Sequence, residues 1–403
     1  MVNVAVLGYG TVGSGVVEVI EGNKALINKR SEQELEVKYI LDLRDFPGDP
    51  YENKVVHDFN MIVNDGDVQI ICETMGGVGA AYQFTKQALE KGISVCTSNK
   101  ELVAKHGPEL LEIAKVNKCN YLFEASVGGG IPIIRPLNDA LTAERVEAIT
   151  GILNGTTNYI LSKMEKEGAD FEDVLKEAQE KGYAERNPEA DVEGHDACRK
   201  IAILSSLMMG KTVDSQKVFT EGITKVTAAD FIYAKAANCS IKLLATGKAL
   251  DDNTAQAMVA PFMISKEHPL AMVNDVFNAV FVTGNMLGDS MYYGRGAGKL
   301  PTASAVVADV IDCARHLGKN VMCFWDKEEV TLADVSETEK RFFVRVAAEA
   351  LAEVEAAFPG GEVLLVEGRK EDAGYFTTSM KEKDFAAKCE ALGNKVLSKI
   401  RLA

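Results

Sequence analysis

The sequence lacks the features that mark several specialised classes of protein. It has no run of about eighteen consecutive apolar residues, so we expect no membrane-spanning helix. Acidic residues outnumber basic ones by 59 to 44, and the net charge of −15 argues against nucleic acid or an anionic membrane as a partner. No internal repeat and no low-complexity tract occurs. The first apolar strand begins directly after Met1, which leaves no room for a signal peptide.

Cysteine and histidine are present without a pattern that would form disulfides or bind metal. The eight cysteines are scattered and include no CxxC pair, which is typical of reduced thiols in a cytoplasmic protein. The five histidines show no spacing of metal ligands, and the most tempting one, His195, stands between Gly194 and Asp196. With 403 residues, of which 47% are hydrophobic, the chain can build two or three domains with cores of their own.

A glycine motif follows the first apolar segment. Val4 to Leu7 predict a buried strand, GYGTVG comes next, and the apolar residues from Val16 to Ile20 continue as a helix. Such glycines give a tight turn, let a pyrophosphate approach the backbone and let the helix pack on the strand, while the helix N-terminus faces the anion. The context favours a dinucleotide site over a purely structural glycine turn. The contacting residues would be Gly8, Gly10, Thr11, Val12 and Gly13.

Two residues that favour different cofactors follow the second predicted strand, residues 37–41. Asp42 would accept hydrogen bonds from the ribose hydroxyls of NAD, whereas Arg44 would hold the additional phosphate of NADP. The two side chains stand almost together, so the sequence does not decide between NAD and NADP. We expect the chain to accept both.

Strands and helices alternate through the first third of the chain. Three further strands are predicted before residue 124, with a helix at 82–91 that ends at Gly92. This alternation predicts an α/β fold with a Rossmann-type doubly wound parallel sheet. Because ligands bind beyond the carboxyl ends of the strands in such sheets, Thr74, Lys100 and Glu124 are candidate site residues.

The segment GYAERNPEADVEGHDACRK, residues 182–200, combines an acidic loop with the start of an apolar helix. The helix is predicted over HDACRKIAILSSLMM, and Lys200 falls one turn after Asp196 on the same side. A lysine with apolar neighbours and nearby carboxylates is a candidate proton donor, because burial and charge both change the pKa of an ammonium group. The alternative is an ordinary helix start with a solvated Asp–Lys pair, and this segment alone does not decide between the two.

Seven motifs carry a resemblance to the homoserine dehydrogenase family. They are GYGTVGSG at Gly8, ETMGG at Glu73, TSNKELVAKHG at Thr97, FEASVGGGIPIIRPL at Phe123, GILNGTTNYIL at Gly151, GYAERNPEADVEGHDACRK at Gly182 and GRGAGKLPTASAVVADVID at Gly294. Any one of them could be coincidence, but all seven occur in order and span most of the chain before its C-terminal tail. The sequence therefore resembles that family closely.

The resemblance implies an oxidoreductase that reversibly reduces L-aspartate 4-semialdehyde to L-homoserine with NAD(P)H, in the biosynthesis of threonine, methionine and isoleucine. Hydride attacks the aldehyde carbon, and the alkoxide that develops needs a proton and a nearby positive charge. By the same resemblance Lys200 donates the proton and Lys100 lies beside the nicotinamide and the substrate. Glu185 and Asp196, with Asp191 in support, would hold the substrate amino group. Further cofactor contacts would be Thr74, Ser98, Lys100 and Gly296.

A monovalent cation, Na⁺ or K⁺, is also implied by the resemblance, in the loop that starts at Glu124. Backbone carbonyls would supply most of its ligands, and glycines let the backbone curl so that hard oxygen atoms converge on the ion. The ligands would be Glu124, Val127, Gly129 and Ile131. The alternative is a glycine-rich turn before Pro132 that holds no ion. The family likeness further implies a homodimer or homotetramer.

Three domains are predicted. Residues 1–133 form the dinucleotide-binding domain, which residues 295–325 complete by returning to it as a helix. Residues 134–294 form a central α+β domain for catalysis and dimerisation. A charged linker, residues 326–339, leads to a tail over residues 340–403, whose predicted βαββαβ order resembles an amino-acid-binding ACT domain.

The tail departs from the ACT pattern at its first loop. An ACT domain binds its amino acid there with an Asp and a Gly, but this chain has VAAEAL over residues 346–351. Helix-forming alanines should use the backbone N–H groups inside a helix rather than leave them for a ligand. We expect the tail to keep its fold as an association surface and to give little feedback inhibition by threonine.

Two rival functions are disfavoured. A phosphorylating semialdehyde dehydrogenase would need an activated cysteine, and Asn238-Cys239-Ser240 superficially resembles such a site, but it falls in the predicted helical run AKAANCSIKLLATG with no histidine nearby in sequence. A non-catalytic dinucleotide-sensing protein could share the fold. Such a sensor would not need the whole set of candidate catalytic and substrate-binding residues.

Overall fold

The N-terminal domain is built on a six-stranded parallel sheet in the computed structural model, which describes all residues from 1 to 403. The strand order β3-β2-β1-β4-β5-β6 is that of a doubly wound dinucleotide-binding sheet, so the predicted Rossmann-type α/β fold is confirmed. The strands are β1 (Val2–Leu7), β2 (Leu35–Leu41), β3 (Val55–Val56), β4 (Val68–Glu73), β5 (Ser94–Thr97) and β6 (Tyr121–Leu122).

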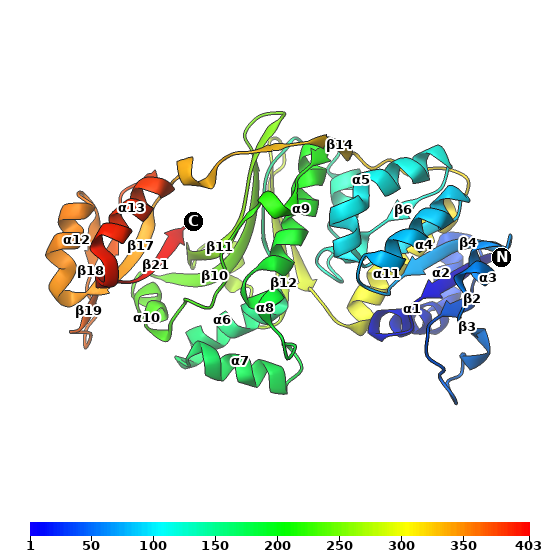
Figure 1. Cartoon of the computed structure of the whole chain (residues 1–403), viewed down its shortest axis with the longest axis horizontal. Coiled ribbons are helices and arrows are strands. Elements are labelled where there is room, and N and C mark those ends of the chain that lie inside the picture. The colour runs from blue at the N-terminus through cyan, green and yellow to red at the C-terminus, as the bar shows by residue number, and fades with distance from the viewer.

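Helices cover both faces of this sheet, and one of them comes from much later in the chain (Figure 1). The local helices are α1 (Thr11–Gly22), α2 (Lys24–Ser31), α3 (Phe59–Val63), α4 (Gly79–Glu90) and α5 (Lys100–Val116). Helix α11 (Lys299–Arg315) packs against α1 so closely that a Cβ atom on Gly15 would lie 2.9 Å from the carbonyl oxygen of Lys299. It begins directly after Gly298, which has φ +123° and ends the preceding loop.

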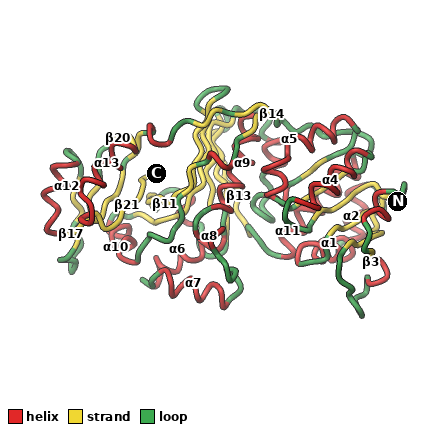
Figure 2. The backbone as a smooth tube through the Cα atoms, viewed as in Figure 1, coloured by secondary structure: helices red, strands yellow, loops and turns green.

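The central domain is an antiparallel sheet with helices on one side (Figure 2). Its strands lie in the order β13-β12-β7-β10-β11, and the sheet belongs to an eleven-stranded assembly. The strands are β7 (Val146–Ile152), β10 (Cys239–Ala249), β11 (Thr254–Ser265), β12 (Phe277–Gly284) and β13 (Gly288–Arg295). Short β9 (Phe219–Thr220) pairs parallel with β11, and short β8 (Lys211–Thr212) belongs to a separate two-stranded sheet. The helices are α6 (Gly155–Glu167), α7 (Phe171–Glu180), α8 (Glu189–Val192), α9 (His195–Met209) and α10 (Ala228–Ala236). No helix of the chain has the length and apolar character needed to cross a membrane.

One sequence-based expectation in this domain is wrong. The run AKAANCSIKLLATG was predicted to be helical, but α10 ends at Ala236 and the rest is strand β10. Asn238 adopts a left-handed conformation with φ +55° and breaks the helix. The following apolar residues pair antiparallel with both β11 and β7, so partners distant in sequence decide the strand.

The tail continues the same sheet. Its strands β17 (Phe342–Ala347), β18 (Glu362–Leu364), β19 (Asp372–Phe376) and β21 (Val396–Leu402) lie in the order β21-β17-β19-β18, and β21 pairs with β11 of the central domain. Helices α12 (Leu351–Ala357) and α13 (Glu382–Leu392) contribute to the core on one face, and Tyr233 of α10 packs against Phe343 near the other face. The βαββαβ order along the chain is thus as predicted, with all neighbouring strands within the tail antiparallel.

The connection to the tail is more ordered than the predicted linker. Within it lie β14 (Asp326–Glu329) and β15 (Thr331–Leu332), which pair with β8 and β11, and β16 (Glu339–Lys340), which pairs with β20 (Met380–Lys381). Charged composition predicted a linker here, and its backbone pairs with distant strands because backbone N–H and C=O groups form hydrogen bonds whatever the side chains are. The connector is therefore attached along much of its length to the domains that it joins.

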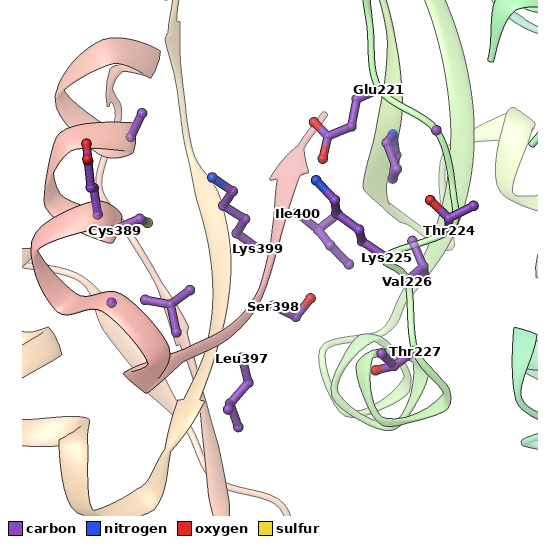
Figure 3. Close-up of a pocket in the computed structure, with 16 residues that line it drawn as sticks. Glu221, Thr224, Lys225, Val226, Thr227, Cys389, Leu397, Ser398, Lys399 and Ile400 are labelled. Atoms are coloured by element: carbon purple, nitrogen blue, oxygen red, sulfur yellow. The ribbon is translucent and has the colours of Figure 1, made fainter. Parts of the chain in front are cut away.

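A cavity of about 820 Å³ lies between the tail and the central domain (Figure 3). Glu221, Thr224 and Lys225 line it from the central domain, and Ser398 and Lys399 of β21 line it from the tail. None of the residues predicted for catalysis, substrate or cofactor is among its lining residues. The residues predicted for the chemistry therefore lie elsewhere in the structure.

Candidate active site

Helix α9 brings the predicted lysine into the interior of the molecule. The helix covers the predicted segment HDACRKIAILSSLMM, and glycines with positive φ, Gly194 at +84° and Gly210 at +66°, flank it at both ends. Apolar residues surround the helix because it packs against the central sheet, with Ile201, Ile203 and Leu204 fully buried. Lys200 is only 9% exposed, so the alternative of a solvated Asp–Lys pair is excluded.

Asp196 joins two lysines from different domains. Its Oδ2 atom lies 2.7 Å from Nζ of Lys200, one helical turn later, as the helical periodicity predicted. Its Oδ1 atom forms an ion pair with Lys100, the first residue of α5 in the dinucleotide-binding domain. The Asp196 side chain makes no helix cap and instead contacts both ammonium groups at the domain junction.

Burial and charge act against each other at this cluster. Burial lowers the pKa of Lys200 because an ammonium group loses solvation, the charge of Asp196 opposes that shift, and the positive charge of Lys100 adds to it. Burial alone would raise the pKa of Asp196, but Lys200 and Lys100 outweigh it and lower that pKa below its usual range. The carboxylate therefore stays charged, while Lys200 is closer to losing a proton at neutral pH than a solvated lysine.

Asn154 completes the cluster, although it was not among the residues predicted for the site. Its Nδ2 atom donates to Oδ1 of Asp191 at 2.7 Å and to Oδ2 of Asp196 at 2.9 Å. Burial raises the pKa of Asp191, although the amide of Asn154 partly offsets the shift. The residue lies inside the motif GILNGTTNYIL, which was the only signal that could have pointed to it.

Glu185 stands apart from this cluster. Its side chain is exposed and makes no hydrogen bond or ion pair, whereas its backbone carbonyl accepts from Nε2 of Gln179 at 3.1 Å. The loop that carries it is tied to α6, because Oγ1 of Thr156 donates to the carbonyl of Tyr183 at 2.6 Å. Thr156 is two residues beyond Asn154, so the loop starts beside the cluster and leaves the Glu185 carboxylate free.

The glycine motif forms an open turn between β1 and α1. Gly8 has φ +90°, and a Cβ atom on Gly13 would lie 1.8 Å from the Gly8 carbonyl oxygen, so both positions require glycine. A Cβ atom on Gly10 would meet nothing within 4 Å, and no side chain caps the start of α1. The backbone N–H groups of Thr11, Val12 and Gly13 lie in this uncapped first turn, which is the arrangement that binds a phosphate.

The predicted residues Thr74 and Ser98 follow neighbouring strands at the same edge of the sheet. Oγ1 of Thr74 lies 2.9 Å from the carbonyl oxygens of both Leu7 and Gly8, so it fixes the glycine turn from the side. The backbone N–H of Ser98 donates to the carbonyl of Glu73 at 3.4 Å. Thr74 therefore borders the open turn, and Ser98 follows the next strand along the same edge of the sheet.

Asp42 and Arg44 form one unit at the end of β2. Oδ2 of Asp42 accepts the backbone N–H of Tyr9, inside the glycine motif, at 2.8 Å. Arg44 lowers the pKa of Asp42 well below its usual range, and the arginine side chain itself is 63% exposed. The carboxylate thus faces the glycine turn with the guanidinium group on its outer side.

Hydrogen bonds to residues outside the loop fix the position of the loop predicted to bind a cation. The carboxylate of Glu124 accepts the backbone N–H groups of residues 133–135 at 2.5 to 2.9 Å, and the Glu124 N–H donates to Asp309 of α11 at 2.9 Å. Within the loop, the buried carbonyl oxygens of Val127, Gly129 and Ile131 accept no hydrogen bond. Buried carbonyls normally have partners, so three without one fit the ligand set of an alkali ion.

Gly296 lies against this loop and against the central sheet. A Cβ atom on Gly129 would lie 2.4 Å from the Gly296 carbonyl oxygen, and one on Gly296 would lie 1.2 Å from Oδ1 of Asn278. Only glycine fits at either position. The structure thus brings together a predicted cation-loop residue and a predicted cofactor residue that are far apart in sequence.

The features of the rival functions are absent from this geometry. Cys239 is half-buried, its Sγ atom contacts the carbonyl of Ala237, and burial raises the pKa of its thiol, which is the reverse of an activated nucleophile. His195 is exposed, and no group of three or more His, Cys, Asp or Glu side chains is arranged to hold a metal ion.

Two family models match most of the chain. The model for the catalytic region, described as homoserine dehydrogenase, matches residues 132–311, and the one described as the homoserine dehydrogenase NAD binding domain matches residues 8–124. Together they include Lys100, Asn154, Asp196 and Lys200.

Individual proteins give the same result. The chain is 47% identical over 317 residues to a homoserine dehydrogenase of Synechocystis, covering 77% of this chain and 73% of that one. The crystal structure of a homoserine dehydrogenase from Thiobacillus denitrificans superposes with a TM-score of 0.89 at 35% identity, covering 100% of this chain and 98% of that one. A hyperthermophilic archaeal homoserine dehydrogenase in complex with NADPH superposes with a TM-score of 0.66 at 29% identity, over 77% and 97% of the two chains.

Proposed function

The chain belongs to the homoserine dehydrogenase family, and from that premise we propose which of its residues carry out the reaction. The enzyme reversibly reduces L-aspartate 4-semialdehyde to L-homoserine with NAD(P)H. The observation that carries our assignment is the carboxylate of Asp196, which holds Lys200 of the central domain and Lys100 of the dinucleotide-binding domain together. We place the reacting carbonyl group of the substrate beside these two ammonium groups.

Lys200 is the proposed proton donor. Bound NAD(P)H supplies the hydride, and the aldehyde oxygen then needs a proton. Nζ of Lys200 gives that proton in the reducing direction and takes it from the homoserine hydroxyl in the oxidising direction. Burial suits the lysine to both roles, because it brings the pKa of Lys200 down towards the working pH. Lys100 contributes a second positive charge that stabilises the developing alkoxide.

Carboxylates at the same junction are proposed to bind the substrate amino group. Oδ2 of Asp191 has no hydrogen-bond partner, and the whole carboxylate of Glu185 is free, so both can accept an ammonium group. Both oxygens of Asp196 already contact lysines, which favours an indirect part for it in substrate binding. Closure of the exposed loop at Glu185 over the substrate would complete the site.

The dinucleotide is proposed to lie across the carboxyl ends of β1, β4 and β5. The pyrophosphate would contact the uncapped first turn of α1, with Thr74, Ser98, Lys100 and Gly296 nearer the nicotinamide. Asp42 and Arg44 would contact the adenosine ribose or its phosphate. The NADPH in the archaeal relative supports NADP for this chain, and the Asp42 carboxylate would accept the ribose hydroxyls of NAD once the exposed Arg44 side chain turns away from it.

A monovalent cation is proposed for the loop from Glu124 to Ile131. The three buried carbonyl oxygens without partners, on Val127, Gly129 and Ile131, support it, and Glu124 would add its own backbone carbonyl. The ion would stiffen the loop that meets Gly296. Replacing Na⁺ and K⁺ in the buffer by a bulky organic cation at equal ionic strength should then lower thermal stability, whereas equal stability in both buffers would argue for an ion-free turn.

The tail and the assembly state complete the proposal. The βαββαβ tail is proposed to be a degenerate ACT-like domain, since Ala348 to Ala350 form a helical turn where an ACT loop would bind its amino acid. A homodimer or homotetramer is proposed, supported by the exposed Met291 and Tyr293 on the edge strand β13. A location in the cytoplasm is proposed as well, supported by the eight free cysteines. Light scattering of the purified protein tests the assembly state.

One assay tests the site assignment as a whole. Steady-state oxidation of homoserine should proceed with NADP and with NAD, measured side by side, and substitution of Lys200 should nearly abolish both. A dinucleotide sensor would bind the cofactor without turnover. An active Lys200→Met enzyme would remove the basis for the assignment.

A further inference from the structure

The turn between β7 and α6 contacts all three charged members of the cluster on the central domain. The carbonyl oxygen of Leu153 accepts from Nζ of Lys200 at 2.8 Å. The next residue, Asn154, donates through Nδ2 to Asp191 at 2.7 Å and to Asp196 at 2.9 Å. Two successive residues of one turn therefore touch the lysine and both carboxylates.

The contacts to Lys200 determine where its remaining proton points. An ammonium group has three N–H donors in a tetrahedral arrangement. One N–H donates to the Leu153 carbonyl at 2.8 Å and another to Oδ2 of Asp196 at 2.7 Å. With two directions fixed, the third N–H has a defined direction, and it is the donor left for a substrate oxygen.

Asn154 is itself fixed at every polar atom. Its Oδ1 atom caps α6 by accepting the backbone N–H of Thr157 at 2.9 Å, and the Thr157 hydroxyl lies 3.1 Å from the same oxygen. Its two amide hydrogens are used by the two carboxylates, and the residue is only 6% exposed. With both amide hydrogens and the amide oxygen of its side chain engaged, Asn154 has no freedom to rotate away.

The turn is also anchored to the segment that we assign to the cofactor. Nδ2 of Asn278 donates to the carbonyl of Ile152 at 2.7 Å, and Oδ1 of the same side chain occupies the space where a Cβ atom of Gly296 would be. Gly155, the first residue of α6, lies close to the Val276 carbonyl, which a Cβ atom would approach to 3.0 Å. The position of the turn is therefore set by the strand and loop beside the proposed nicotinamide site.

We infer that Asn154 is a positioning residue for the reaction: its amide bridges Asp191 and Asp196 and thereby holds Lys200 with its free N–H directed at the substrate. Two carboxylates side by side repel each other, the more so because Asp196 is buried, and a donor between them stabilises the pair in one geometry. Without the bridge, Asp196 loses one of the contacts that fix its Oδ2 atom. The ammonium group of Lys200, which donates to that oxygen, is then no longer held in one orientation. This inference rests on the proposed role of Lys200.

The inference predicts the behaviour of two substitutions that keep the helix cap. Serine and aspartate cap helices about as well as asparagine, so Asn154→Ser and Asn154→Asp should retain the start of α6. Both remove the two amide donors, and the aspartate adds a third negative charge to the cluster. We expect kcat for homoserine oxidation to fall by about tenfold to a hundredfold, because small misplacements of reacting groups have effects of that size.

A pH profile separates positioning from support of the fold. Oxidation requires neutral Lys200, so its rate rises with pH, and loss of the amide beside Asp196 should move that rise to higher pH, further for Asn154→Asp than for Asn154→Ser. The KM for NADP should stay unchanged. The matched control is Asn158→Ser in the same helix, where Nδ2 of Asn158 donates only to carbonyls of residues 273–277 at 3.0 to 3.2 Å. That variant should lose thermal stability and keep the wild-type pH profile.

The outcomes distinguish this inference from the assignment on which it rests. Wild-type rates and pH profiles for both Asn154 variants, with an inactive Lys200→Met enzyme, would overturn the inference and leave the role of Lys200 standing. Slower Asn154 variants whose pH profiles match wild type would also overturn it, since support of the fold alone explains that result. An active Lys200→Met enzyme would remove both. Combining Asn154→Ser with Lys200→Met should give no further loss of rate, as residues that act as one unit are not additive.

Discussion

The guanidinium group of Arg44 lies against the carboxylate of Asp42, with Nε 3.0 Å from Oδ1 and Nη2 3.0 Å from Oδ2. The carboxylate also accepts the backbone N–H of Tyr9 in the glycine motif at 2.8 Å. The acidic residue that suits NAD and the basic residue that suits NADP therefore neutralise each other before a cofactor binds. An arginine that is 63% exposed can turn outward, which leaves either contact available.

The first prediction follows from this pair. Arg44→Ala should raise the KM for NADP by about tenfold or more, the size of a lost charge-assisted hydrogen bond, and should change the KM for NAD little. Asp42→Ala should have the opposite selectivity. Steady-state kinetics with both cofactors measure this, and unchanged ratios of kcat/KM in both variants would show that other residues select the cofactor.

The second prediction concerns the proton donor. Lys200→Met should lower kcat by about a hundredfold to ten-thousandfold, the usual contribution of general acid–base catalysis, while NADP binding measured by fluorescence stays intact. Lys242→Met is the matched control, because Lys242 is also a buried lysine and its Nζ contacts only the carbonyl of Val273 and Oδ1 of Asn274. The control should lose stability and keep its turnover.

The third prediction uses the charge of Lys100. That charge adds to the burial that lowers the pKa of Lys200, so removing it in Lys100→Met lets the pKa of Lys200 rise. Oxidation needs the neutral lysine, so the rising limb of the pH profile for homoserine oxidation should move to higher pH as kcat falls. If the rate of Lys100→Met falls but its rising limb stays at the wild-type pH, then the charge of Lys100 does not influence the pKa of Lys200.

The fourth prediction concerns substrate binding by Glu185. Because this carboxylate has no partner within the chain, Glu185→Gln should raise the KM for homoserine and leave that for the dinucleotide nearly unchanged. Glu189→Gln, an exposed acidic residue at the start of α8, controls for the general loss of negative charge nearby. If both KM values rise together, the loop supports the fold of the site rather than the substrate.

The fifth prediction concerns the tail. The N–H of Ala348 donates to the carbonyl of Glu371 at 2.9 Å at the start of the helical turn of residues 348–350, so this N–H is not free for an amino acid. L-threonine at millimolar concentration should therefore inhibit homoserine oxidation little, with D-threonine as the control. Strong inhibition by the L-isomer alone would restore a regulatory role to this domain.

Removal of the tail is not a suitable test of that role. Arg345 of β17 is 8% exposed and forms ion pairs with Asp230 of α10 at 2.9 Å and with Asp372 of β19 at 3.0 Å. Deletion would leave Asp230 buried without its partner and would expose the edge of β11 that pairs with β21. Loss of activity in a truncated chain would therefore report on stability as much as on regulation.

Signals between residues close in sequence were sufficient to predict the nucleotide domain and the helix of the active site. The spacing of glycines, the run of apolar residues before them and the helical interval between Asp196 and Lys200 all depend on residues close in sequence, and their geometry is set within one or two turns of chain. The bounds of α9 and the parallel sheet were predicted for this reason. The family likeness added roles to these positions but not their contacts.

Tertiary structure decided what depends on pairing between distant segments. Residues 239–249 became strand β10 because β7 and β11 supply backbone partners on both sides, which outweighs the helical character of the run. The connector at residues 326–339 is paired with strands for the same reason. The cluster itself is assembled across domains, since Lys100 meets Asp196 and Asn154 bridges two carboxylates from α8 and α9. A linear sequence records which polar groups exist, but only the packing of helices and strands determines which of them satisfy one another.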